Sequence, residues 1–226
     1  MTQGRATRRD GMVPLLVLIS ATTGLVDAVS VLGLGRVFTA NMTGNIVFLG
    51  FAVAGAPGFS WHYCTAALLA FLAGAAAGGR LFRAIGQRRR KWLLVVASVE
   101  AALLAGAATT GLVAGRSEAS LIAMIGLTGA AMGLRNATVR QLKIPDLTTT
   151  VLTVTITGVA ADSRWAGGDG PNLGRRFLSI SAIMVGAFAG ALLVLAVGTA
   201  LPLLVAAAGT LIPTIALARD VPAEAG

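Results

Sequence analysis

Apolar stretches of about 20 residues recur along this chain, and short polar segments separate them. That length is what an α-helix needs to cross the hydrocarbon core of a bilayer. The pattern predicts a helical segment in each of these ranges: 12–34, 39–56, 63–83, 92–114, 119–139, 147–161, 177–197 and 200–218.

Two of the segments begin with a group of polar residues. The first group is Phe38-Thr39-Ala40-Asn41-Met42-Thr43-Gly44-Asn45, and the second is Pro145-Asp146-Leu147-Thr148-Thr149-Thr150. Polar groups that face lipid are costly, so these residues must face protein or water. We interpret the two groups as the same structural element, present once in each half of the chain, and we expect the functional site to lie between them.

Composition narrows the class of protein. The chain has 226 residues, of which 56% are hydrophobic and only 12% are charged, whereas a soluble domain is about 25% charged. We therefore expect an all-α polytopic membrane protein. One transmembrane domain covers 12–219, between a tail at 1–11 and a tail at 220–226.

The formal net charge is +9, and the basic residues stand at the ends of the apolar runs. This pattern favours orientation in a lipid bilayer over contact with nucleic acid. If every segment crossed, the basic loop 80–91 would lie opposite the N-terminal arginines, against the positive-inside rule. If 39–56 and 147–161 instead re-enter on the side they came from, the N-terminus, 80–91, 135–143 and 164–176 all become cytoplasmic. We therefore predict about six transmembrane helices and two re-entrant or broken helices.

Three crossings per half would invert the second half relative to the first. A shift of 105 residues supports a repeat of 12–114 in 119–219, since it places Thr23-Gly24 on Thr128-Gly129 and Asn41 on Asp146. Each third span also holds a Gly-xxx-Gly pair, Gly74/Gly78 and Gly186/Gly190, which lets helix backbones pack closely. We therefore expect an inverted-topology repeat.

The polar groups predict a binding site. Asn41 can cap a short helix that begins near Met42, and Asp146 can do the same in the second half. Two half-helix N-termini would then point toward the midplane and suit an anion or a polar carbonyl. The alternative is that these side chains only join helices. The predicted substrate-binding residues are Asn41, Thr43, Asn45, Asp146, Thr148 and Thr149.

Charged residues inside the spans suggest coupling. Asp27 lies in the first span and Glu100 in the fourth, and a carboxylate there either finds a cation or takes up a proton. The alternative is a fixed ion pair, with Arg36 as a mate for Asp27 and Arg135 or Arg140 as mates for others. The predicted coupling or gating residues are Asp27, Arg36, Glu100, Arg135 and Asn136.

Catalytic motifs are not found in the sequence. No Gly-x-Ser-x-Gly, His–Glu–x–x–His or phosphate-cradling loop with Lys is present. The chain has one cysteine, Cys64, and one histidine, His62, so neither a disulfide nor a metal cluster is expected. We expect no enzyme activity and no cofactor.

The residues Gly24-Leu25-Val26-Asp27-Ala28, followed by 38–45, resemble the YoaK-like family of bacterial integral membrane proteins. Gly133-Leu134-Arg135-Asn136-Ala137 resembles its second motif, although Arg135 stands where the family pattern would have Gln. The resemblance covers about 13–217 and implies a multi-pass protein of the bacterial inner membrane. The family is described as one of unknown function and brings no substrate.

Three functions remain open from the sequence. The first is a secondary transporter of a small polar or anionic solute, with protons as the coupling partner. The second is a passive channel for small neutral solutes, and the third is a scaffold whose polar residues only pack helices. Assembly into a homo-oligomer also stays open.

Overall fold

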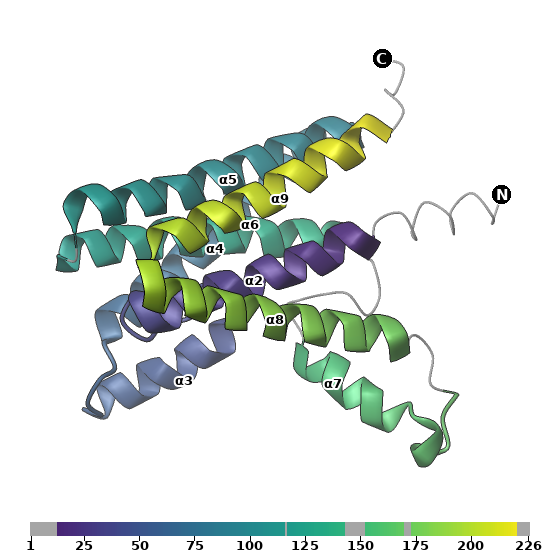
Figure 1. Ribbon diagram of the computed structural model, residues 1–226, viewed down its shortest axis with the longest axis horizontal. Helices are drawn as coiled ribbons and strands as arrows, with labels where there is room; N and C mark the ends of the chain where they lie inside the picture. The colour runs from purple at the N-terminus through teal and green to yellow at the C-terminus, as the bar shows by residue number, and fades with distance from the viewer. Residues whose placement is uncertain (1–12, 116, 143–151, 170–172, 221–226) are drawn as a thin grey trace.

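A computed structural model describes residues 13–115, 117–142, 152–169 and 173–220, and Figure 1 presents the arrangement of their helices. In these ranges the chain is helical and contains no strand. The α-helices are α2 (Val13–Gly33), α3 (Met42–Val53), α4 (Trp61–Ile85), α5 (Arg89–Ala114), α6 (Glu118–Leu142), α7 (Leu152–Ala161), α8 (Leu173–Val197) and α9 (Ala200–Asp220). A short 3₁₀ helix, η2 (Arg164–Ala166), follows α7.

The predicted division into long and short helices is confirmed. Within the described residues, six helices contain 21 to 26 residues, so each is at least about 31 Å long. Helix α3 has 12 residues and α7 has 10, or about 18 and 15 Å, which is about half of a hydrocarbon core. Four helices, α4, α5, α8 and α9, are both long and apolar enough to cross a membrane.

Helices α2 and α8 lie in backbone contact. A Cβ atom added to Gly186 of α8 would stand 1.8 Å from the carbonyl oxygen of Ala21 in α2, and one added to Gly24 would stand 2.1 Å from that of Ile183. Gly190 meets Leu25 one turn further on. The contact runs from Ala21 with Gly186 to Leu25 with Gly190, so residue numbers rise together in both helices and the helices are parallel.

Helices α4 and α6 form a second pair of the same kind. A Cβ on Gly74 of α4 would stand 2.0 Å from the carbonyl oxygen of Ala130, and one on Gly133 of α6 would stand 2.1 Å from that of Phe71. Gly78 meets Ala137. Both predicted Gly-xxx-Gly pairs thus allow close helix contact. In lipid the hydrophobic effect does not drive helices together, so such close packing is what stabilises their association.

The parallel pairs place the loops at two ends of the bundle. Helix α2 begins, α4 ends, α5 begins, α6 ends and α8 begins at one end, and α9 also ends there (Figure 1). We call this the basic end, because it carries most of the described basic residues: Arg80, Arg83, Arg88, Arg89, Arg90, Lys91, Arg140, Arg164, Arg175, Arg176 and Arg219. The opposite end carries Arg36. The charge distribution used to predict the topology is therefore present in the fold.

Helix α3 begins beside the bundle, partway along α2. The backbone amide of Ala40 donates to the carboxylate of Asp27, which lies six residues, or about 9 Å, before the end of α2. After α3, Gly58 lies against the guanidinium of Arg36, and Gly35 lies against the ring of Tyr63 in α4. The chain thus turns back along α2, begins α3 at the level of Asp27, and leaves again at the end where α2 finished.

Helix α7 is attached to the start of α8. Arg176 Nη1 lies 2.7 Å from Asp162 Oδ2, and a Cβ on Gly158 would stand 2.7 Å from that same nitrogen. In Figure 1, α3 and α7 both lie outside the long helices, on one side of the bundle. The second polar group, at 145–150, lies outside the described residues.

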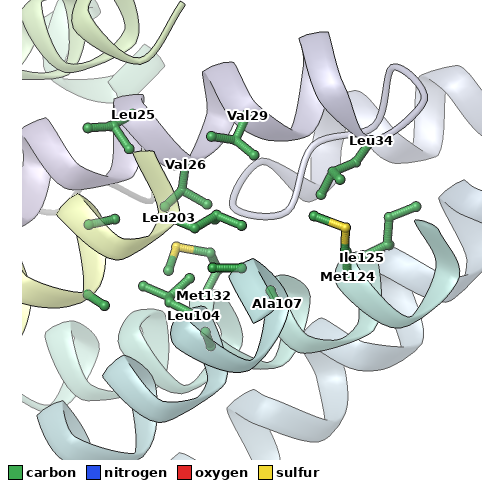
Figure 2. Close-up of a cluster of buried hydrophobic side chains, with 14 of the residues drawn as sticks. Leu25, Val26, Val29, Leu34, Leu104, Ala107, Met124, Ile125, Met132 and Leu203 are labelled. Carbon is green, nitrogen blue, oxygen red and sulfur yellow. The ribbon is translucent and has the colours of Figure 1, made fainter. Parts of the chain in front are cut away.

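The main core joins α2, α5, α6 and α9. Figure 2 shows side chains of these helices meeting, with Val26 and Val29 opposite Leu104, Met132 and Leu203. Helices α4 and α8 keep apolar faces outward, where Leu69 and Leu72 of α4 are each 62% exposed and Phe188 of α8 is 66% exposed. In a bilayer these outward faces meet lipid.

Replacing Gly186 with Ala should destabilise the protein by about 1–3 kcal/mol, since the added methyl group overpacks the contact with Ala21. Gly79→Ala is the matched control, because no heavy atom lies within 4 Å of a Cβ at that position. Thermal unfolding of the two variants in the same detergent measures the difference. Equal transition temperatures would contradict the close contact of α2 with α8.

Single cysteines in a Cys64→Ser background should report the two ends of the bundle. We expect an impermeant thiol reagent to label Ala54→Cys in intact cells, but to label Arg88→Cys and Ala166→Cys only after lysis. These three positions avoid the glycines that have positive φ at 58 and 167. Labelling of Ala54 and Arg88 from the same side of the membrane would contradict the arrangement of α3 and α4.

Candidate functional site

The turn before α3 is held by Asn45. Its side chain is completely buried, its Nδ2 donates to the carbonyl oxygen of Phe38 at 2.5 Å, and its Oδ1 accepts from the amide of Phe38 at 2.8 Å. Nδ2 also lies 3.7 Å from the sulfur of Met42. Asn45 is one of the residues predicted to bind substrate, and its amide is bonded to the backbone of its own turn.

Asn41 begins α3 as predicted. Its Oδ1 accepts from the amide of Gly44 at 3.4 Å, which satisfies one of the free N–H groups of the first helical turn. Asn41 and Thr43 are both exposed. The sequence therefore identified the cap and the first residue of the helix, while the outward position of Thr43 depends on how α3 packs against α4.

Asp27 and Thr39 bring unpaired polar atoms to the same turn. Three buried side-chain polar atoms lack a hydrogen-bond partner among the described residues, and they are Asp27 Oδ1, Thr39 Oγ1 and Trp92 Nε1. Thr39 is completely buried, and it precedes the residue whose amide reaches Asp27. Thr39 was not among the predicted site residues, although it belongs to the polar group that predicted the site.

Arg36 does not pair with Asp27. Arg36 is exposed, has a φ of 61° and places its guanidinium against Gly58. The turn that follows α2 directs its side chain outward, away from the carboxylate. The pairing considered from sequence is therefore not formed.

Glu100 and Arg135 form an ion pair in the centre of the bundle. Arg135 Nε donates to Glu100 Oε1 at 2.9 Å and Arg135 Nη2 donates to the same oxygen at 2.5 Å. Both side chains are 2% exposed. A charge this deeply buried is tolerated only when it is paired and hydrogen-bonded.

The remaining hydrogens of Arg135 reach two more helices. Nη1 donates to the carbonyl oxygen of Ile19 at 3.2 Å and to Thr23 Oγ1 at 2.9 Å, and Nη2 donates to Thr210 Oγ1 at 2.8 Å. All five N–H groups of the guanidinium are thus used. One arginine of α6 links α2, α5 and α9.

The threonines of this network were missed from sequence. Thr210 and Thr214 stand four residues apart, as do Thr23 and Asp27, so each pair lies on one face of its helix. That spacing is the signal that could have found them. The same spacing places Asp27 one helical turn beyond Thr23, so the charge of Arg135 also acts on the Asp27 carboxylate.

Of the other predicted residues, Asn136 lies in α6 and the rest lie outside the described ranges. Asn136 is buried, and its Nδ2 donates to the carbonyl oxygen of Met132 in its own helix at 2.9 Å. Asp146, Thr148 and Thr149 belong to 143–151, outside the described ranges. Within those ranges, no group of three His, Cys, Asp or Glu side chains could hold a metal ion.

Long apolar helices in close parallel pairs, with a buried ion pair in their core, define an all-α multi-pass membrane protein. Residues 15–216 match the family described as "Protein of unknown function (DUF1275)". The chain belongs to this family, as its motifs at 24–28 and 38–45 predicted.

One curated relative is the UPF0700 transmembrane protein YoaK of Bacillus subtilis (strain 168). It is 32% identical over 152 residues, which are 66% of this chain and 65% of the relative's length. The match thus spans slightly less than two thirds of that protein. No solved structure matches the chain.

Removing one partner of the central ion pair should destabilise the fold strongly. Glu100→Ala and Arg135→Ala should each lower the free energy of unfolding by about 3–5 kcal/mol, because a buried charge is left unpaired. The double variant Glu100→Leu/Arg135→Met should lose less free energy of unfolding than the two single variants lose together. Equilibrium unfolding in lipid–detergent micelles measures these values.

Asp162→Ala is the control for that series, since Asp162 pairs with Arg176 but is 45% exposed. It should cost clearly less than either core variant, because solvent screens the partly exposed Asp162 carboxylate, although its partner Arg176 is buried. Additive losses in the double variant would mean that Glu100 and Arg135 do not act as one unit.

Proposed function

We propose that the protein is a secondary transporter of a small polar solute in the bacterial inner membrane. The solute binds beside the N-terminus of α3, where Asp27 and Thr39 contribute side chains. Asp27 couples movement of the solute to protons or gates the site.

The observation that carries this proposal is that Asp27 Oδ1 and Thr39 Oγ1 are buried and have no hydrogen-bond partner among the described residues. Leaving a buried polar group unsatisfied costs about 1–3 kcal/mol, and such groups are costly in a membrane unless they are used. The neighbouring Asn45 shows the contrast, because both ends of its amide are bonded. A bound solute that donates a hydrogen bond would satisfy the atoms at Asp27 and Thr39.

The arrangement of the helices supports a transporter architecture. The first helix of each half packs most extensively on the third helix of the other half, α2 on α8 and α4 on α6. The fourth helices, α5 and α9, pack on each other. These pairings are what an inverted repeat of 12–114 in 119–219 would produce, with α3 and α7 as the matching half-helices.

Orientation follows from charge. The basic end is cytoplasmic by the positive-inside rule, which places the N-terminal tail, 1–11, in the cytoplasm. Helix α3 then starts near the midplane and ends on the outer side. Asp146, Thr148 and Thr149 are proposed to contribute from the cytoplasmic half in the matching way.

The position of Asp27 narrows the class of solute. A helix N-terminus alone would attract an anion, but here a carboxylate already accepts from the amide of Ala40, just before the Asn41 cap. The region therefore offers hydrogen-bond acceptors as well as the N–H donors in the first turn of α3. A polar solute with a donor group fits it better than a simple anion.

Transport can be tested in phosphatidylethanolamine–phosphatidylglycerol liposomes that contain the purified protein and a pH-sensitive dye. We expect saturable uptake of one member of a panel of glycine, urea, glycerol, formate and ammonium, with a change in internal pH. Asp27→Asn should lower the rate by about tenfold or more, a loss of roughly 1.4 kcal/mol per factor of ten. Thr39→Val, which keeps the shape but removes the hydroxyl group, should raise the half-saturating concentration.

Glu118→Gln is the matched control, because it removes an exposed carboxylate in the first turn of α6, outside the core, and should leave uptake unchanged. Uptake that stays linear with concentration would support a channel instead. Normal folding of Asp27→Asn and Asn41→Ala with no change in any flux would support a scaffold.

A further inference from the structure

The turn between α4 and α5 concentrates positive charge at the basic end. We call its basic residues the α4–α5 basic cluster, and they are Arg80, Arg83, Arg88, Arg89, Arg90 and Lys91. All of them except Arg89 are exposed. The sequence contains no Asp or Glu between Asp27 and Glu100, and Glu100 is buried in its pair with Arg135. The cluster therefore has no acidic residue close to it in the sequence.

Described carboxylates do not neutralise this cluster. Five of its members form no ion pair with an Asp or Glu of the described ranges, and they are Arg80, Arg83, Arg88, Arg90 and Lys91. Arg176 shows the contrast at the same end of the bundle, since it is paired with Asp162. Like charges that lie close together repel one another and oppose the compact state. An anionic partner would remove that repulsion.

Helix α4 continues the cluster into an apolar strip. Spacings of three and four residues place one set of side chains on a single face of the helix: Leu69, Leu72, Ala76, Arg80 and Arg83. All of these side chains are exposed. The buried residues of α4 lie on the opposite face: Cys64, Ala67, Gly74 and Gly78. One outward face of α4 is thus apolar along its length and basic at its end.

The depth of these residues matches the dimensions of a lipid leaflet. Arg80 lies about 28 Å along α4 from Trp61, which is close to the thickness of a hydrocarbon core. Trp61 is 53% exposed, and tryptophan is common at the membrane interface. Arg80 therefore lies at the level of the lipid phosphates at the basic end, and Leu72 lies about 12 Å deeper.

We propose that the α4–α5 basic cluster binds the phosphate headgroup of an anionic phospholipid, whose acyl chains lie along the outward face of α4. Basic residues at the membrane surface attract anionic headgroups, and the exposed side chains of Leu69 and Leu72 offer apolar surface to the chains. A lipid fits better than a soluble anion because the charged and apolar surfaces are continuous on one helix. The site does not depend on transport of a solute.

The test uses the purified full chain in mixed micelles with equal amounts of phosphatidylglycerol and phosphatidylcholine that carry the same acyl chains. Mass spectrometry after gel filtration gives the ratio of the two retained lipids. We expect the wild type to retain at least about tenfold more phosphatidylglycerol. Arg83→Gln should lower this ratio about fivefold, since one basic residue near the surface contributes about that factor. Arg83→Lys, which keeps the charge, should leave it unchanged.

Arg164→Gln is the matched control, because Arg164 is also exposed at the basic end. It follows α7, which Figure 1 shows on the opposite side of the bundle from α5, so the lipid ratio should not change. Equal losses in the two Gln variants would mean that the whole basic end attracts anions without a site at α4 and α5. Equal retention of the two lipids by the wild type would mean that anionic lipid is not selected.

A soluble anion is distinguished by competition. Sodium phosphate and sodium chloride at the same ionic strength should displace phosphatidylglycerol equally, because both only screen the charges. Stronger displacement by phosphate would identify a site for the free anion. That result, like either of the two preceding ones, would overturn the inference.

Discussion

Backbone contact between parallel helices organises this protein. In lipid, apolar side chains gain little by meeting one another, so helices associate where small residues let their backbones approach. Gly24 and Gly186 do this for α2 with α8, and Gly74 and Gly133 do it for α4 with α6. Arg135 then ties α6 to α2, α5 and α9 through buried hydrogen bonds, which joins the two pairs into one core.

The buried polar side chains are of two kinds, which differ in whether their polar atoms have hydrogen-bond partners. Asn45 and Arg135 are bonded to fixed partners, and they hold the turn before α3 and the centre of the bundle. Asp27 in α2 and Thr39 in the turn before α3 each keep a buried atom that has no partner among the described residues. The first kind therefore supports the geometry, and the second kind is where a ligand would have most effect.

Much of the fold could be predicted because a bilayer allows few solutions. Apolar runs of helical length, and polar groups at the head of two of them, predicted the eight α-helices of the described residues and identified the two short ones. Asn41 could be recognised as a cap since its partner, Gly44, is three residues away. Candidate site residues were harder to choose, because residue type alone does not distinguish Asn45, whose amide is bonded, from Thr39, whose hydroxyl group has no partner among the described residues.

The sequence by itself determined the class of protein, the order and length of the helices, and the gathering of basic residues at one end, because length, hydropathy and charge act locally along the chain. Tertiary structure decided which polar groups meet. Glu100 and Arg135 are 35 residues apart, and Arg135 reaches Thr23 across 112. Only the packing of α2, α5, α6 and α9 brings these groups within hydrogen-bond distance, and in the described part of the chain the same packing leaves Asp27 Oδ1 without a partner.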